Sequence, residues 1–404
     1  MPIQNLETKI LIVVQRFGLD VSGGSESLAR EWAHRLSKNY QITVATTCAK
    51  DDTSWKNYYP EGDNQEGNTW NSNVLVKRFK VDFPRDIDAF SFYSSSILSH
   101  PRVQLDSVQE EWMQKQGPVS TTLFEFLEQH SRDYQLVIFF TYLYATTALG
   151  MRKVPSEVPT VLVSTAHDEP PIYLPIFKDV FYRPDFILFN TEAEKRFCYK
   201  LFPKIKRSCI IGGGIDVAHD FLNRNKDAQL GDTPYFLYVG RIAPGKWLPE
   251  LFEYYKQLFP SIQVPLHLVG RVQMECPQDS YFKYLGFVSK EERDHQIKYA
   301  RAMIVPSHFE SLSLSTLESW SLGTPVIVNG QCEVLADHVY QSCGGLIYRY
   351  GSEFRLCIEY AISHPKEMAV MGQQGYNYVR DNYSWSVIEQ RLQENLSSIL
   401  TLRA

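Results

Sequence analysis

The sequence predicts an α/β protein made of two doubly wound, Rossmann-like domains. Short β-branched and aromatic runs alternate with longer segments of helical period, which is typical of parallel sheets joined by crossover helices. The alternation stops at 211–234, a segment rich in Gly, Asp and Asn, and then begins again. A chain of 404 residues is also longer than one core usually supports. We therefore expect two domains that face each other across a cleft at the carboxyl edges of their sheets.

The first domain is expected over 1–213. Its strands are predicted at 9–15, 41–47, 74–79, 135–140, 160–165 and 185–190. The segment 22–38 is predicted to be helical, because Leu28, Trp32 and Leu36 recur every four residues. Region 49–134 fits the alternation poorly before a helix at 120–131. We interpret it as an insertion that carries substrate recognition, since variable loops often do so.

The second domain is expected over 214–385. Its strands are predicted at 235–240, 266–270, 284–288, 302–307 and 324–329, and helices at 248–259, 291–300 and 315–323. The last segment, 386–404, is predicted to be a helix that packs back toward the first domain.

Composition narrows the classes of function. The net charge of −5 is unlike that of a polyanion-binding protein, and we expect no nucleic-acid partner. Seven scattered cysteines without a C-x-x-C pair favour a reducing cytoplasm over disulfides or structural zinc. The longest apolar runs have the length of strands, and no signal peptide is recognisable at the start. We expect a cytoplasmic protein that needs no cofactor and no metal.

One basic run stands apart from the general composition. Residues 194–207 interleave six Lys and Arg residues with Phe, Leu and Ile. The simpler interpretation is an amphipathic helix and loop that cover a sheet. The alternative is a patch that rests peripherally on an anionic membrane at its inner face.

Two glutamates are the first candidate site residues. Glu310 follows the strand at 302–307, and Glu318 lies about one turn into the next helix. Carboxylates suit sugar diols because each oxygen accepts from a different hydroxyl, and the helix N-terminus accommodates phosphate. Glu318 would then bind a ribose and Glu310 a hexose. The alternative is a capping residue and a solvated surface charge.

Two cations follow the first strand of the second domain. Arg241 comes directly after Gly240, and Lys246 comes after the turn residues Pro244 and Gly245. A forked guanidinium and a compact ammonium suit a diphosphate that gains charge as it departs. A solvent-facing basic loop is the alternative.

Two weaker signals lie in the first domain. Gly23 and Gly24, in the turn 22–27, would let backbone N–H groups approach a phosphate, although a plain turn with Ser25 as helix cap explains the same residues. His167 and Asp168 follow the strand at 160–165. The histidine can contact a sugar hydroxyl, but a lone His is more often structural.

Other matches are set aside. The D-x-D at 86–88 lies within the insertion rather than after a strand that closes a nucleotide site, and we interpret it as a chance match to a metal motif. Cys332, His338 and Cys343 lack the spacing of a zinc site.

Taken together, these segments resemble the GT-B glycosyltransferases of family 4 (the retaining, glycosyl transferase group 1 type). The resemblance covers nearly the whole chain in order and spacing. It is carried by GGSES with its helix, FNTEAEKR (189–196), GGGID (212–216), YVGRIAPGK (238–246), YLGFVSKEE (284–292), FESLSLSTLESWSLGTPVIVNG (309–330) and NYSWSVIEQRL (382–392).

The resemblance implies a role for each candidate residue. It implies that Glu310 contacts the donor hexose and Glu318 the ribose. Arg241 and Lys246 are implied to bind the diphosphate. The base is expected near Arg271 and Phe287. The remaining donor-binding residues implied are Ser311, Leu312, Ser313 and Leu314, with the glycine turn at Gly23 and Gly24 and the histidine of the site at His167. Three residues replace glycines that are usual in the family: Ser311, Ser313 and Trp247.

The implied activity is a retaining, metal-independent transfer of a hexose in polysaccharide biosynthesis. UDP-glucose is the favoured donor, with GDP-linked or UDP-N-acetyl sugars as alternatives, and a saccharide or lipid-linked saccharide in a bacterial cytoplasm is the expected acceptor. Two other functions remain open: a UDP-sugar epimerase of the same fold, and a sugar-nucleotide-binding protein without catalysis.

Overall fold

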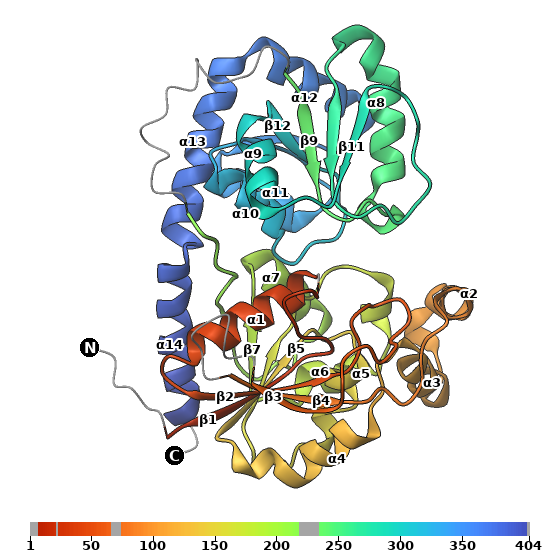
Figure 1. Cartoon of the computed structure of the whole chain (residues 1–404), viewed down its shortest axis with the longest axis vertical. Helices are drawn as coiled ribbons and strands as arrows, with labels where there is room; N and C mark the ends of the chain where they lie inside the picture. Colours follow the sequence, from red (N-terminus) through yellow and green to blue (C-terminus); the bar gives the residue numbers. More distant parts are fainter. Residues whose placement is uncertain (1–6, 22, 66–73, 218–233, 402–404) are drawn as a thin grey trace. The chain divides into compact units, whose positions relative to one another are not determined.

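A computed structural model describes residues 7–21, 23–65, 74–217 and 234–401. The chain divides into two compact units (Figure 1). The first comprises 1–211 together with 391–404, and the second comprises 212–390. Ser22 of the predicted glycine turn and most of the predicted linker, 218–233, lie outside the described residues.

The first unit is built on an eight-stranded sheet in the order β3-β4-β2-β1-β5-β6-β7-β8. Among its described strands, the edge pair β3–β4 is antiparallel and the other pairs are parallel. The strands are β1 (Lys9–Val13), β2 (Gln41–Thr47), β3 (Gly62–Gln65), β4 (Val74–Phe79), β5 (Leu136–Phe140), β6 (Thr160–Val163), β7 (Phe186–Phe189) and β8 (Ser208–Ile210). The order of the strands reverses between β1 and β5, so the loops after these two strands diverge.

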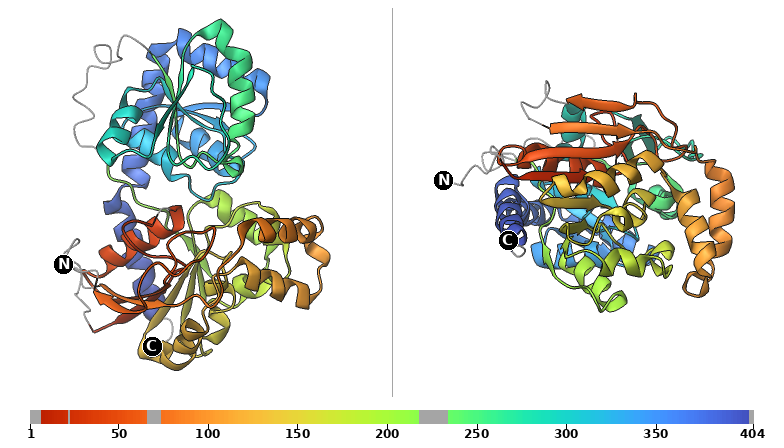
Figure 2. Two further views of the ribbon diagram at one scale, coloured as in Figure 1. Left: turned by 45° about the vertical axis from the view of Figure 1, so that its right-hand side comes forward. Right: turned by 90° about the horizontal axis from the view of Figure 1, so that it is seen from below.

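Helices cover both faces of this sheet (Figures 1 and 2). They are α1 (Gly24–Leu36), α2 (Ile87–Leu98), α3 (Asp106–Gln116), α4 (Thr121–His130), α5 (Ala145–Ala148), α6 (Phe177–Tyr182) and α7 (Glu192–Leu201). Phe139 packs in the core that contains Trp112 of α3 and Leu123 of α4. Phe140 points to the opposite face, where its ring meets Trp32 of α1 edge-on at 5.4 Å between centroids.

Region 49–134 is more regular than the sequence indicates. It contains α2 and α3 in addition to the predicted strand and helix, and both of these helices lie to one side of the sheet (Figure 2). Their weak apolar periodicity explains why the sequence does not reveal them: Ser94 and Ile97 are the buried residues of α2. Asp86 caps α2 by accepting bonds from the backbone N–H groups of Asp88 and Ala89, which gives the D-x-D segment a structural role.

The second unit contains a six-stranded parallel sheet in the order β11-β10-β9-β12-β13-β14. Its strands are β9 (Phe236–Val239), β10 (Leu266–Val269), β11 (Phe282–Gly286), β12 (Ala302–Val305), β13 (Val326–Asn329) and β14 (Gly345–Tyr348). This is the 3-2-1-4-5-6 order of a Rossmann fold, in which the switch point lies between the first and fourth strands, here β9 and β12.

Helices again cover both faces of the sheet. They are α8 (Leu248–Ile262), α9 (Lys290–Tyr299), α10 (Leu314–Ser321), α11 (Glu333–Ser342), α12 (Gly351–Ser363) and α13 (Pro365–Asn382), followed by α14 (Trp385–Thr401), which continues into the first unit. Tyr238 packs with α8 and α12, whereas Leu237, which points the other way, packs with Ile297 of α9. Alternate residues of β9 therefore supply two separate cores. The fold is the predicted one: two doubly wound α/β units.

Two helices approach closely through glycine in the second unit. Gly375 of α13 faces the indole of Trp320 on α10, and a Cβ at this glycine would overlap the ring. Trp320 is fully buried and donates from Nε1 to the carbonyl oxygen of Gly344 at 2.8 Å. The ring therefore has no room to withdraw.

We expect Gly375→Ala to lower the free energy of unfolding by about 1–3 kcal/mol, because an added methyl group in a filled core forces the helices apart. Gly245→Ala is the matched control, since a Cβ there meets nothing within 4 Å. Urea unfolding followed by tryptophan fluorescence measures both. Equal stability of the two variants would contradict the packing described here.

Candidate functional site

The switch point of the second unit brings two predicted residues together. Lys246 ends the 3₁₀ turn η7 (Pro244–Lys246) after β9, and Glu310 lies in the loop after β12. Because β9 and β12 are neighbours, these loops leave the same edge of the sheet. Lys246 Nζ lies 2.6 Å from Glu310 Oε1. The two side chains keep 28% and 15% of their surface exposed, so the pair is shielded but open to a ligand.

Both loops contain residues in a left-handed conformation. Trp247 has φ 59° and ψ 28°, and Ser313 has φ 61° and ψ 70°. Such a conformation costs a residue with a side chain about 1–2 kcal/mol relative to glycine. These are two of the three positions where the resemblance leads one to expect glycine. The structure therefore retains the turn geometry that glycine would provide and tolerates the strain at both places.

An aromatic cluster surrounds Trp247. Its indole stacks on the His308 ring, with 4.4 Å between centroids and 11° between planes, and meets Phe309 edge-on at 4.9 Å. His308 Nε2 also lies 3.3 Å from Glu250 Oε2. Stacked rings contribute about 0.5–1.5 kcal/mol beyond their burial, which offsets part of the strain at Trp247.

Arg241 follows β9 with an exposed side chain. Its backbone is held in place because its carbonyl oxygen accepts a bond from Tyr238 Oη at 2.8 Å. Beside it, Gly270 leaves no room for a Cβ against the carbonyl group of Gly240. The exits of β9 and β10 therefore run together, and they remain paired as far as the bridge between Ile242 and Val272.

The residues predicted for the base also meet. Arg271, after β10, lies over the ring of Phe287, after β11, with 5.3 Å from Cζ to the ring centroid. Phe287 is 73% exposed. An exposed aromatic ring beside a guanidinium presents a flat surface for a planar base.

Glu318 has a partner that the sequence did not indicate. Arg293 of α9 places Nη2 3.2 Å from Glu318 Oε1. Burial raises the pKa of Glu318, and the Arg293 charge opposes this shift. A carboxylate held in this way can still accept hydroxyl hydrogen bonds, because only part of its acceptor capacity is used.

The predicted donor segment 310–314 is partly interior. The side chains of Leu312 and Ser313 are buried, and the Ser313 hydroxyl lies 2.9 Å from Thr316 Oγ1. Ser311 and Leu314 are half-buried. Leu312 and Ser313 therefore contribute to a ligand through their backbone or through the shape of the loop rather than through their side chains.

A buried histidine supports this segment from behind. His338 Nε2 donates to the carbonyl oxygen of Leu312 at 2.9 Å, and Nδ1 lies 3.1 Å from the hydroxyl of Tyr378. Burial lowers the pKa of His338 to about 4. The sequence showed only a histidine without metal-site spacing, and its supporting role depends on tertiary contacts.

In the first unit, the glycine turn is occupied by a side chain of the protein itself. Gly23 precedes α1, and a Cβ there would overlap the carboxylate of Glu26, a buried residue in the first turn of the helix. Glu26 forms an ion pair with Arg16 and accepts bonds from Gln15 Nε2 at 2.9 Å and Ser25 Oγ at 2.8 Å. This explains Gly23 sterically and gives Ser25 a role other than helix cap. Gly24 is the first residue of α1. A phosphate at this turn stays a prediction.

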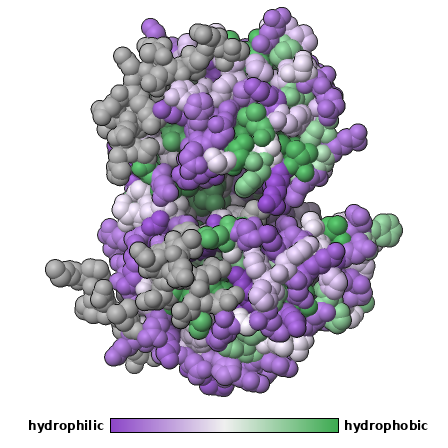
Figure 3. Space-filling view, in the orientation of Figure 1, coloured by the Kyte–Doolittle hydropathy of each residue, from purple (hydrophilic) through white to green (hydrophobic). Residues whose placement is uncertain are grey.

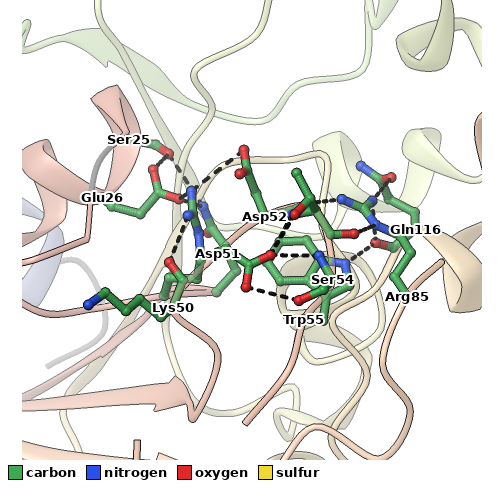
Figure 4. A network of polar contacts seen from close by, with 12 residues as sticks. Ser25, Glu26, Lys50, Asp51, Asp52, Ser54, Trp55, Arg85 and Gln116 are labelled. Atoms are coloured by element: carbon green, nitrogen blue, oxygen red, sulfur yellow. Dashed lines mark hydrogen bonds and ion pairs between the residues drawn. The ribbon is translucent and has the colours of Figure 1, made fainter. Parts of the chain in front are cut away.

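Beside it, the loop after β2 is held by a dense polar network (Figure 4). Asp51 accepts bonds from Thr53 and Ser54. Trp55 Nε1 and Arg85 Nη1 both donate to the carbonyl oxygen of Gln116, at 2.8 and 3.0 Å. Burial lowers the pKa of Arg85. These bonds attach the loop to the end of α3, so the start of the region predicted to carry recognition is held in place.

His167 lies in a supported loop after β6. Its Nδ1 is 3.5 Å from Glu169 Oε1, which also accepts a bond of 2.6 Å from the buried Tyr142 hydroxyl. The buried carboxylate of Glu194 accepts bonds from Ala166 N and Asn190 N, both at 2.6 Å. Burial raises the pKa of Glu194 to about 7 against these bonds. Asp168 instead accepts from the Tyr173 hydroxyl at 2.6 Å.

The basic run 194–207 has its apolar side turned inward. Phe202 and Ile205 belong to the core of the first unit, with Phe197 and Leu201 packed against it, whereas five of the cations are exposed: Arg196, Lys200, Lys204, Lys206 and Arg207. Any membrane contact here would therefore be electrostatic. Exposed apolar side chains gather instead around α2, where Figure 3 shows an apolar tip, and Phe92 is 85% exposed.

The described residues contain neither a metal-ligand cluster nor a membrane-spanning helix. No group of three or more His, Cys, Asp or Glu residues is placed to hold a metal ion in the described ranges. Within the same ranges, no helix combines the length and apolarity needed to cross a membrane.

Part of the second unit is similar to a known protein family. Residues 220–378 match the family model of the glycosyl transferases group 1. O-antigen chain mannosyltransferase B of Escherichia coli is 30% identical over 125 residues, which cover 27% of this chain and 32% of that protein. The chain thus matches about a third of the length of this curated relative.

Solved structures match over both units. Sucrose-phosphate synthase of Thermosynechococcus elongatus gives a TM-score of 0.72 at 16% identity, covering 98% of this chain and 100% of that one. HepE of Anabaena, in complex with UDP and glucose, gives 0.66 at 15% identity over 97% and 100%. The trehalose-6-phosphate synthase OtsA gives 0.68 at 13% identity over 97% and 99%. These matches confirm the predicted GT-B fold. The match of residues 220–378 to the glycosyl transferases group 1 agrees with the predicted resemblance, whereas membership of family 4 stays a prediction.

His338 makes stability depend on pH in a defined direction. Its pKa of about 4 in the folded chain lies below the ordinary value of 6.5, so the unfolded chain takes up the proton first. The folded state therefore loses stability as the pH falls from 6.5 to 4, by about 3 kcal/mol in total from this group. We expect His338→Gln to flatten this part of the profile in urea unfolding between pH 7 and 4. His130→Gln, at an exposed histidine, should leave it unchanged; equal profiles for wild type and His338→Gln would refute the assignment.

Proposed function

We propose that this chain, whose residues 220–378 match the family model of the glycosyl transferases group 1, transfers a hexose from a nucleotide sugar to a saccharide or lipid-linked saccharide. The transfer retains the anomeric configuration and requires no metal ion. The observation that carries the proposal is the pairing of Lys246 with Glu310 at the switch point of the second unit. The pairing holds a cation that can stabilise the leaving group, Lys246, next to a carboxylate that can accept bonds from sugar hydroxyls, Glu310.

Each residue of the site has a role in the reaction. Lys246 and Arg241 neutralise the charge that develops on the departing diphosphate, and Glu310 accepts hydrogen bonds from the hexose hydroxyls. Glu318 binds the ribose, and Arg271 with Phe287 receives the base. The acceptor oxygen attacks the anomeric carbon on the face from which the phosphate oxygen leaves. That oxygen takes the acceptor's proton, so no carboxylate need act as nucleophile.

The ion pair balances the charge of the site. Lys246 and Glu310 neutralise each other in a partly shielded place, where two unpaired charges would be costly. A diphosphate offers Lys246 a stronger partner, and the sugar offers Glu310 hydroxyl donors. Donor binding thus exchanges one set of charge-assisted bonds for another.

UDP-glucose is the favoured donor, and the complex of HepE with UDP and glucose supports this preference at the level of the fold. GDP-linked and UDP-N-acetyl sugars are tested beside it, because one partial relative is a mannosyltransferase. That relative is named for an O-antigen chain, which supports an acceptor in polysaccharide synthesis. A thermal-shift screen of nucleotide sugars identifies the donor by the largest increase in melting temperature.

The two alternative functions differ in their products. An epimerase would release a changed sugar from the donor without an acceptor, and a binding protein would leave every nucleotide sugar intact. Release of UDP from UDP-glucose that accelerates with acceptor, and persists in EDTA, supports the proposed transferase. Formation of an epimer, or full recovery of the donor, would reject it.

We expect Glu310→Ala to lower turnover by about a hundredfold or more, because the sugar loses contacts that position it for attack. Affinity for UDP should stay within a few-fold and tend to rise, since Lys246 no longer pairs with a carboxylate. Isothermal titration with UDP and a coupled UDP-release assay measure the two quantities. Glu253→Ala, at an exposed glutamate of α8, is the control. Wild-type turnover in Glu310→Ala would remove the sugar-contact role.

Lys246→Ala should lower turnover by about a hundredfold, because a preorganised cation that faces developing charge contributes several kcal/mol. UDP affinity should also fall, unlike in Glu310→Ala. The exposed Lys256 of α8 supplies the control Lys256→Ala in the same assay. If both lysine variants turn over at the wild-type rate, Lys246 does not serve the leaving group.

A further inference from the structure

Two kinds of contact link the loop after β9 to the loop after β12. One is the ion pair of Lys246 with Glu310. The other is aromatic: Trp247 stacks on His308 and meets Phe309 edge-on. The stacked pair lies one residue after Lys246 and two residues before Glu310.

The two links respond differently to a ligand. In the proposed reaction the Lys246 ammonium binds the diphosphate and the Glu310 carboxylate binds the sugar. The ion pair between them would therefore open when the donor binds, and it could no longer hold the two loops together during transfer. The Trp247–His308 stack uses no group assigned to substrate, so nothing in the proposed reaction draws its two rings apart. It then joins the two loops while their charged residues bind opposite ends of the scissile bond.

His308 is itself restrained. Its Nε2 lies 3.3 Å from Glu250 Oε2, and Glu250 Oε1 accepts a bond of 2.6 Å from the Tyr254 hydroxyl. Both partners belong to α8, the helix that begins directly after Trp247. The His308 ring thus contacts the indole and, through Glu250, helix α8, so the loop after β12 is joined to both.

The backbone conformation of Trp247 also indicates a role for its side chain. A bulky residue occupies a left-handed position that glycine would adopt without strain. Burial does not explain it, since the side chain is only half-buried. The contacts with His308 and Phe309 are what this side chain adds at the site.

We propose that the Trp247–His308 stack is a positioning clasp, which keeps Lys246 and Glu310 on the same donor molecule after ligand binding has opened their ion pair. The proposal rests on the function assigned above to those two residues. Trp247 and His308 act through their neighbours and need not touch the reacting atoms.

The test compares Trp247→Gly, His308→Ala and their double variant with Trp247→Phe, which keeps a stacking ring. Hydrogen exchange is measured with and without UDP over the loop 307–313. In wild type and Trp247→Phe, this loop should stay protected when UDP is bound. In Trp247→Gly and His308→Ala, its exchange with UDP should quicken by about tenfold, while α13 keeps its protection.

Turnover provides a second measurement. Trp247→Gly should lower kcat by about tenfold or more with little change in donor KM, because misplaced groups cost rate more than binding. The double variant should be no slower than the worse single variant, since both remove one contact. Trp247→Phe should recover most of the rate.

Two outcomes would overturn the clasp: unchanged loop exchange in Trp247→Gly with UDP bound, or independent, additive losses in the double variant. Failure of the proposed function looks different, because wild type would then transfer no sugar from any donor while the exchange experiment with UDP would still report whether the loops are coupled.

Discussion

The strand order of the second unit reverses between β9 and β12, and the candidate donor site depends on that reversal. Loops that leave neighbouring parallel strands at a switch point diverge, so a ligand can enter between them. Lys246 and Glu310 are 64 residues apart, yet they meet because they occupy these two loops. The residues predicted for the base follow β10 and β11, next along the same edge of the sheet.

The charged side chains at this edge are paired with one another, and each pair is exposed enough to exchange its partner for a ligand. Lys246 neutralises Glu310, and Arg293 neutralises Glu318. Each carboxylate is shielded enough that its cationic partner stabilises it, and exposed enough to accept a hydrogen bond from a hydroxyl group. In the first unit, by contrast, the Glu26 carboxylate is buried against Arg16. That pair stabilises the turn before α1 and is far less suited to exchange with a ligand, because a buried ion is costly to separate from its partner.

Two residues of the candidate donor site have a strained backbone. Trp247 and Ser313 adopt left-handed conformations on the two loops that present Lys246 and Glu310. Each is held by a nearby contact: Trp247 by the His308 ring, and Ser313 by the Thr316 hydroxyl. Behind the second loop, His338 supports the carbonyl group of Leu312. Rigid support of this kind is what fixes groups that must act on a ligand in a defined geometry.

The amino-acid sequence by itself determined the doubly wound architecture, because alternating strands and helices leave few other ways to bury their apolar faces. It also indicated Lys246 and Glu310, since turn residues and charges after strands mark the functional edge of such sheets. Tertiary structure decided what these residues touch. Two of these contacts join residues far apart in the chain: Arg293 with Glu318, and His308 with Trp247. The third, Glu26 with Gly23, is local, but no pattern in the sequence reveals it. The helices α2 and α3 were not predicted for a related reason: their apolar residues follow a helical period only weakly, and the core that they meet is formed by tertiary packing.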